Sequence, residues 1–270
     1  TSAAYYGPRF DYNPATLASR GLLVEEARTN YAVKSELFNS APWGTSETLT
    51  ANSVSSPDGQ TNGWKLQAVS TTLAQLYQSL GSVGTGAVTD TWVVKAGTTD
   101  WVSITAFDGG TRTENYVNVS TGTAGTLGSG CTMAIRSLGN GWYSISVTAT
   151  RASSPVYGVI CVADADGSLS VTAGKYVYLF SYQIEVGAFA TSYIPTAASS
   201  VPRSADSASM TGTDFSAWWN ATEGTFVINV ASFGYNPSTV NYAMAALTKL
   251  SYLAVLFLRS PPINLRTPTS

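Results

Sequence analysis

The chain has 270 residues and no histidine, which excludes a Ser-His-Asp triad, a Cys-His dyad, a His-ligated zinc site and an imidazole general base. Only 11% of the residues are charged, against about 25% in an average soluble protein. The formal net charge of -2 provides no basic surface, so binding to nucleic acid is not expected. A chain of this length can bury a large core without disulfide bonds, and any catalysis would have to depend on carboxylates.

Residues 1–40 are predicted to form an extended arm or connector. Pro8, Pro14 and the polar turn at residues 11–14 disfavour a regular sheet there. Residues 22–24 are apolar and predict one short strand within the arm. The arm also contains the sequence GLLVEEARTN at residues 21–30.

Residues 41–196 have the pattern of successive β-strands separated by turns. Turn signals rich in Gly, Asp and Asn occur at residues 57–59, 108–110 and 140–141. The predicted strands cover residues 48–54, 62–69, 73–80, 87–95, 100–107, 114–119, 131–136, 142–149, 156–163 and 175–185. This spacing predicts an all-β fold, an antiparallel jelly-roll β-sandwich with an extended N-terminal arm and a smaller C-terminal segment.

The two cysteines, Cys131 and Cys161, fall on two of these predicted strands. They are too few for a Cys-rich metal site. Cys161 lies in an apolar run at residues 159–162, so two reduced and partly buried thiols are expected rather than a disulfide. A disulfide would require the two strands to be neighbours.

The last predicted strand alternates strongly. Its aromatic and aliphatic side chains recur at every second position, which predicts one apolar face directed at the core. The residues assigned to this face are Tyr176, Tyr178, Phe180, Tyr182 and Ile184.

Residues 197–206 are rich in Ala, Ser and Pro and predict a linker. The C-terminal segment at residues 207–270 includes an apolar run at residues 242–258. Lys249 near the middle of that run would cost roughly 2.5–3.5 kcal/mol in a membrane, so membrane insertion is not expected. The favoured interpretation is a buried helix or a pair of strands that acts as an interface element between subunits.

Four sequence phrases together carry a resemblance. They are GLLVEEARTN at 21–30, KAG at 95–97, LGNGWY at 138–143, and the long phrase from the last strand through the linker at 176–206. In this order they resemble a module of tailed-bacteriophage virion surface proteins of the tail-fibre or head-fibre type. The resemblance covers roughly residues 8–225 and implies a carbohydrate-binding jelly roll. Residues after 215 resemble the start of a lectin-like segment of the concanavalin A or laminin G type, which 207–270 would contain in part.

Sugars are bound by aromatic rings that stack on pyranose faces, beside amides and carboxylates that bond to hydroxyls. Side chains that the strand alternation turns away from the core are therefore the candidates for binding carbohydrate. These candidates are Gln75, Tyr77, Tyr116, Asn118 and Tyr157. Trp101 is a further candidate, because it follows a turn at a strand start, where its ring can project from the rim of the sheet. Packing in the core is the more common role for large aromatic residues, and it stays open for each of them.

Asp164 and Asp166 precede Gly167 with a spacing similar to that of an oxygen-rich calcium loop. The loop lacks the further acids of an EF-hand, so a solvated turn is the alternative. One structural calcium at these two residues is the only cofactor predicted.

Glycoside hydrolysis needs two carboxylates about 5–10 Å apart across a cleft. The acids available for such a pair are Asp90, Asp100, Asp108, Glu114 and Glu185. Most of them occupy turn positions, where Asp is common. A non-enzymatic protein is therefore expected.

The resemblance implies a tail-fibre or head-decoration protein on the virion surface, extracellular after host lysis, that recognises host-surface glycans. Weak binding at single sites would be strengthened by several copies per virion, and the resemblance implies a homotrimer in contact with other virion proteins. Two alternatives remain. One is a purely structural virion or capsid-decoration protein that uses the sandwich for subunit contacts, and the other is an accessory carbohydrate-binding module of a polysaccharide-degrading enzyme.

Overall fold

The computed structural model describes residues 9–13, 16, 18–152, 156–209 and 212–217, with the side chains of 214 and 215 excepted. The chain divides into two units, Thr1–Trp219 and Asn220–Ser270, and every described residue belongs to the first. The predictions for the C-terminal segment, including the apolar run at 242–258, lie almost wholly outside the described residues.

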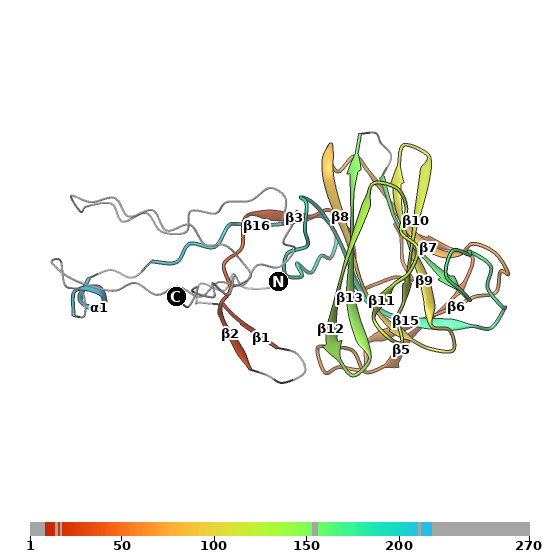
Figure 1. Cartoon of the computed structure of the whole chain (residues 1–270), viewed down its shortest axis with the longest axis horizontal. Coiled ribbons are helices and arrows are strands. Elements are labelled where there is room, and N and C mark those ends of the chain that lie inside the picture. Colours follow the sequence, from red (N-terminus) through yellow and green to blue (C-terminus); the bar gives the residue numbers. More distant parts are fainter. Residues whose placement is uncertain (1–8, 14–15, 17, 153–155, 210–211, 218–270) are drawn as a thin grey trace, which may run out of the picture. The chain divides into compact units, whose positions relative to one another are not determined.

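The first unit is built from two six-stranded antiparallel sheets (Figure 1). The first sheet contains β4 (Trp43–Thr45), β7 (Ala74–Gly81), β9 (Trp101–Asp108), β10 (Thr111–Asn118), β11 (Thr123–Ala124) and β14 (Val156–Ala163). The second contains β5 (Thr48–Val54), β6 (Gly63–Gln67), β8 (Gly86–Ala96), β12 (Cys131–Gly139), β13 (Trp142–Arg151) and β15 (Tyr176–Val186). The remaining elements are β1 (Phe10–Tyr12) paired with β2 (Ser19–Leu22), β3 (Arg28–Asn30) paired with β16 (Val201–Arg203), and the short helix α1 (Thr213–Ser216).

The strand order is that of a jelly roll. Without its edge strands, the first sheet has the order β10-β9-β14-β7 and the second has the order β13-β8-β15-β6. Along the chain these eight strands alternate between the sheets except at the β9–β10 hairpin, which lies within the first sheet, and they return in nested pairs, as in two interlocked Greek keys. The predicted all-β sandwich is confirmed, and every predicted strand from 48–54 to 175–185 is present within a few residues of its expected bounds.

The core between the sheets is rich in aromatic rings. The rings of Trp92 and Tyr182 lie 4.3 Å apart, and Phe38 meets the ring of Trp43 edge-on at 5.0 Å. Phe38 belongs to the segment assigned to the arm, yet it is buried, as are Asn30, Ala32 and Ser35. The N-terminal segment therefore enters the core from about residue 30 onward.

The prediction for the core face of β15 is wrong for Tyr176, Tyr178 and Phe180, and it is correct for Tyr182 and Ile184 beyond the middle of the strand. The pairing of β15 with β8 shifts between Leu179 and Tyr182, which marks a β-bulge. Before the bulge Val177 and Leu179 face the core, and after it Tyr182 does. A bulge inserts one residue and so exchanges the faces of all residues beyond it. Tyr176, Tyr178 and Phe180 therefore lie on the outer face, where Phe180 packs with Val93 and Trp142.

A buried ion pair joins the two sheets within the core. Arg151 at the end of β13 pairs with Asp90 of β8, and both side chains are about 1% exposed. The Tyr182 hydroxyl donates to the same carboxylate at 2.6 Å. Arg151 also donates to the backbone carbonyl of Phe107 in the first sheet. The pair thus connects strands of both sheets.

A second connection, here called the clasp, ties the N-terminal arm to the segment after the sandwich. β3 pairs with β16, and the predicted linker is thus partly a strand. Beside this ribbon, Glu25 accepts from the Ser192 amide at 2.6 Å and pairs with Arg203 at 3.0 Å. Asp206 pairs with Arg9 and accepts from the Glu25 amide at 2.8 Å.

Replacing Asp90 by Asn is expected to destabilise the fold by about 3–5 kcal/mol, because it leaves the Arg151 charge buried and unpaired. Urea unfolding of the purified chain measures this free energy. The control is Asp100→Asn, which removes the same charge at an exposed position and should change stability by less than about 0.5 kcal/mol. Equal effects of the two substitutions would contradict the stabilising role of the buried pair.

The clasp is expected to weaken in acid. Burial alone would raise the pKa of Asp206, but hydrogen bonds from Arg9 and the Glu25 amide and the charges of Arg9 and Arg203 lower it below its ordinary value of 3.8. A carboxyl with a lowered pKa in the folded state stabilises that state above its ordinary pKa, and this contribution is lost as the pH falls through the lowered value.

Calorimetry of the wild type and Asp206→Asn from pH 7 to pH 2 tests this linkage. The difference in melting temperature should be constant near neutral pH and should shrink as the pH falls below the ordinary carboxyl value. A difference that does not change with pH would show that the Asp206 charge has no part in the clasp.

Candidate functional site

The outer face of the first sheet carries all the predicted carbohydrate-binding residues. The register of β7, β14, β9 and β10 places alternate residues of each strand on this face. Cross-strand pairs on it include Phe107 with Arg112 and Trp101 with Asn118. Gln75, Tyr77 and Tyr157 share the face from the neighbouring strands. The sequence prediction of which side chains turn away from the core is thus in accord with the strand register.

A groove occupies one end of this face. It has a volume of about 280 Å³, which is slightly below the usual range of small-molecule pockets, about 300–1,000 Å³. Its lining residues come from β7, β9, β10 and β14, and they are Gln75, Tyr77, Phe107, Arg112, Tyr157 and Val159. The structure therefore brings together three of the predicted residues, Gln75, Tyr77 and Tyr157, in one concave surface of the size of a single sugar residue.

Three aromatic rings form one wall of the groove. The ring of Tyr157 lies 4.7 Å from that of Phe107 and 6.3 Å from that of Tyr77. The Tyr77 ring lies over Gly44 of β4, where a Cβ atom would come within 2.7 Å of the ring. Gly44 thus leaves room for the Tyr77 ring to lie close to the sheet. The rings are only partly buried, so they offer an apolar surface that water can reach.

A polar network adjoins the aromatic wall. Arg112 donates to Glu114 at 2.8 Å, to Gln75 at 3.0 Å and to the Thr105 hydroxyl at 3.0 Å. Glu114 also accepts from the hydroxyls of Ser103 at 2.6 Å and Thr105 at 2.7 Å. Since Ser103 and Thr105 are fully buried, they hold the carboxylate in one position. The groove therefore has a fixed polar side and an apolar side.

Cys161 lies beneath the polar network. It is fully buried, and Arg112 approaches its sulfur at 3.5 Å. Burial raises the pKa of the Cys161 thiol to about 12, so the thiol is neutral at physiological pH and a poor nucleophile. Both cysteines are free thiols, and they lie on opposite sheets, on β12 and β14.

The other three carbohydrate-binding candidates lie outside the groove, toward the opposite end of the same face. Tyr116 is only 6% exposed, so its ring packs within the protein and is not available to a ligand. Trp101 lies under the loop after β11, because a Cβ atom on Gly125 would come within 2.6 Å of its ring. Asn118 accepts hydrogen bonds from the Ser120 and Thr121 amides and so caps a turn.

Asp164 and Asp166, the two predicted calcium ligands, accept hydrogen bonds from two different threonines. Asp164 accepts from the Thr172 amide at 2.7 Å and its hydroxyl at 2.6 Å. Asp166 accepts from the Thr126 amide at 2.7 Å and so fastens the loop over Trp101. Within the described part of the chain, no three Asp, Glu or Cys residues gather in a way that could hold a metal ion. The predicted calcium site therefore stays a prediction.

The predicted binding residues did not include Phe107 and Arg112, which line the groove, or Glu114, which accepts from Arg112 beside it. Tyr116 and Asn118 were selected on β10 by alternation, and the same alternation continued toward the start of the strand gives Glu114 and Arg112. The turn after Asp108 then places Phe107 opposite Arg112. The sequence signal for these residues was therefore present in the predicted hairpin.

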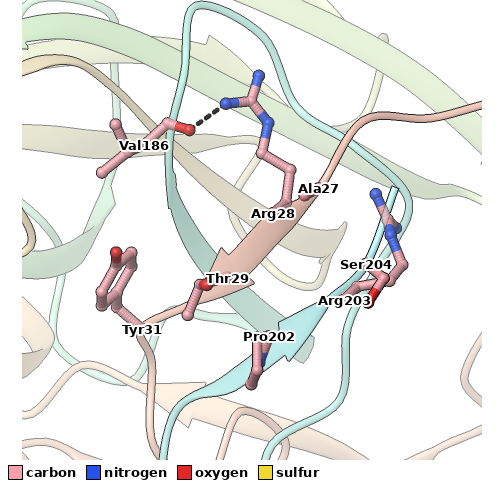
Figure 2. Close-up of a pocket in the computed structure, with 8 residues that line it drawn as sticks. All are labelled: Ala27, Arg28, Thr29, Tyr31, Val186, Pro202, Arg203 and Ser204. Atoms are coloured by element: carbon pink, nitrogen blue, oxygen red, sulfur yellow. Dashed lines mark hydrogen bonds between the residues drawn. The ribbon is translucent and has the colours of Figure 1, made fainter. Parts of the chain in front are cut away.

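A second cavity, of about 370 Å³, lies at the clasp. Figure 2 shows Arg28 directed at the Val186 carbonyl, with Thr29 and Pro202 from the paired strands beside it. Arg28 also pairs with Glu26 and lies 3.7 Å from Glu185, while Arg203 pairs with Glu25. The charged side chains around this second cavity are thus paired with one another and join the arm to the sandwich. The groove on the first sheet is therefore the better candidate for binding a ligand.

No helix among the described residues is long and apolar enough to cross a membrane. No protein-family model matches the chain, and no curated protein matches it.

Proposed function

We propose that this chain is a surface protein of a tailed-bacteriophage virion, a tail fibre or a head decoration, and that it binds host-surface glycans in the groove. The observation that carries the proposal is the convergence of three partly exposed rings with a fixed polar network. A pyranose ring needs both, because its CH groups pack on aromatic faces while its hydroxyls exchange hydrogen bonds.

The proposed function is binding of the glycan without hydrolysis. Glycosidases use a pair of carboxylates as acid and base or nucleophile. No Asp or Glu is among the described residues that line the groove. Glu114 is the one carboxylate that bonds to the side chain of a lining residue in the described part of the chain. It is occupied by the hydroxyls of Ser103 and Thr105 and by Arg112, which suits a binding role.

A small groove implies weak binding at each site. In the proposed homotrimer, several grooves on one particle would engage the same cell surface, and avidity would exceed the affinity of one site. The proposal includes a position on the outside of the virion, contact with other virion proteins, and an extracellular location after lysis.

A purely structural virion role is the second candidate, and one observation favours it. Half of the large hydrophobic residues exposed in the described part of the chain lie on or next to the β1–β2 hairpin, namely Phe10, Tyr12, Leu22 and Val24. Exposed apolar side chains gathered in this way are typical of contact surfaces between subunits.

The substitution Tyr77→Ala is expected to weaken glycan binding by about 5–30-fold, equivalent to roughly 1–2 kcal/mol, because it removes one ring from the aromatic wall. A glycan-array screen of the purified full chain supplies the ligand, and calorimetric titration measures the affinity. The control is Tyr176→Ala, which removes a partly buried ring from the outer face of the second sheet and should leave the affinity unchanged.

Thermal unfolding of both variants separates binding from stability. If the folded wild-type multimer binds no glycan on the array, the glycan proposal fails and the structural role is favoured. If Tyr77→Ala unfolds normally and binds as tightly as the wild type, the groove is not the binding site.

A further inference from the structure

The charge of the groove is balanced within the protein. Arg112 is the one cationic residue among those that line it, and its side chain is 28% exposed. Its guanidinium donates to Glu114, Gln75 and Thr105 and approaches the Cys161 sulfur. The carboxylate of Glu114 cancels the charge of Arg112 at a distance of 2.8 Å, so the pair presents a net charge of zero to a ligand.

The position of this pair is built into the sheet. The Glu114 side chain is 16% exposed and is held by the buried hydroxyls of Ser103 and Thr105. Arg112 is held from the opposite side by the Gln75 amide oxygen. A ligand could draw Arg112 away from Glu114 only by leaving a half-buried carboxylate without its partner, which is unfavourable. The pair is therefore expected to remain intact when the groove is occupied.

The unoccupied polar atoms beside the pair are neutral. Within the described part of the chain, no hydrogen bond is formed by the Gln75 amide nitrogen or by the hydroxyls of Tyr77 and Tyr157. The amide nitrogen can donate, and each hydroxyl can both donate and accept. These groups lie next to the aromatic wall, where they can bond to sugar hydroxyls while the rings contact the sugar face.

From this charge balance we infer that the groove selects uncharged pyranoses and discriminates against sugars that carry a carboxylate. A sugar hydroxyl can accept from Arg112, which lines the groove, without disturbing its pairing with Glu114. A sugar carboxylate would meet no uncompensated cation, would face the Glu114 charge and would lose its own hydration. This inference rests on the proposed glycan-binding function.

Matched pairs of probes test the selectivity. Multivalent glycoconjugates of glucose and galactose are compared with those of glucuronic and galacturonic acid by biolayer interferometry on the full chain, alongside an array that contains neutral and carboxylated glycans. The wild type is expected to prefer the neutral member of a pair by about tenfold or more. This comparison needs no variant, so it does not depend on whether a substituted chain folds.

Glu114→Gln tests the cause of the selectivity. The substitution keeps the shape of the side chain and removes its charge, so Arg112 becomes available to a sugar carboxylate. The ratio of neutral to acidic binding should shift toward the acid by about tenfold. Asp100→Asn removes one negative charge at an exposed position outside the groove and should leave the ratio unchanged. Thermal unfolding confirms that each variant is folded.

The outcomes separate this inference from the proposed function. Equal or tighter binding of carboxylated glycans by the wild type, weakened by Tyr77→Ala, would overturn the selectivity and leave the groove as the glycan site. A neutral preference that Glu114→Gln does not change would overturn the charge-balance explanation. If no array member binds, the proposed function fails, and the inference fails with it. A neutral preference that shifts in Glu114→Gln alone supports the inference.

Discussion

The buried contact among Asp90, Arg151 and Tyr182 is the constraint on which the rest of the sandwich depends. It joins β8, β13 and β15 of the second sheet, and it reaches the first sheet where Arg151 donates to the Phe107 carbonyl. Tyr182 also extends across the core to β14, where Gly158 provides the space because a Cβ atom there would overlap the tyrosine hydroxyl. Phe107 lines the groove, and Gly158 lies between Tyr157 and Val159, the two residues of β14 that line it. The contact that closes the core therefore also fixes the strands that carry the aromatic wall.

The two outer faces of the sandwich differ, and this difference explains where a ligand can bind. On the second sheet, Gln183 and Glu185 are buried, because the arm and the segment after β15 cover them. Glu185 accepts from the Thr191 amide at 2.8 Å and from its hydroxyl at 2.7 Å. Val93, Trp142 and Phe180 form a small apolar cluster farther along the same face. The outer face of the first sheet is covered at the Trp101 end and open at the Phe107 end, which leaves the groove.

Much of this architecture could be predicted from the sequence, because alternation and turn residues are local signals. They gave the strands of the sandwich and the side chains on the outer face of β7, β10 and β14. The bulge in β15 left no comparable signal, since both registers place aromatic residues on the core face and packing against Trp92 decides between them. The pairing of β3 with β16 joins segments distant in sequence, which alternation cannot reveal.

The four sequence phrases that carry the phage resemblance meet one another in the structure. GLLVEEARTN at 21–30 and the phrase at 176–206 form the clasp through β3 and β16. Lys95 donates to the Asn140 carbonyl at 2.8 Å, which joins the second phrase to the third, and a Cβ atom on Gly97 would overlap Tyr176 of the fourth. None of these phrases includes a residue that lines the groove. The resemblance therefore concerns the scaffold, and we expect proteins with the same phrases to differ in ligand wherever the residues of β7, β9, β10 and β14 that form the groove differ.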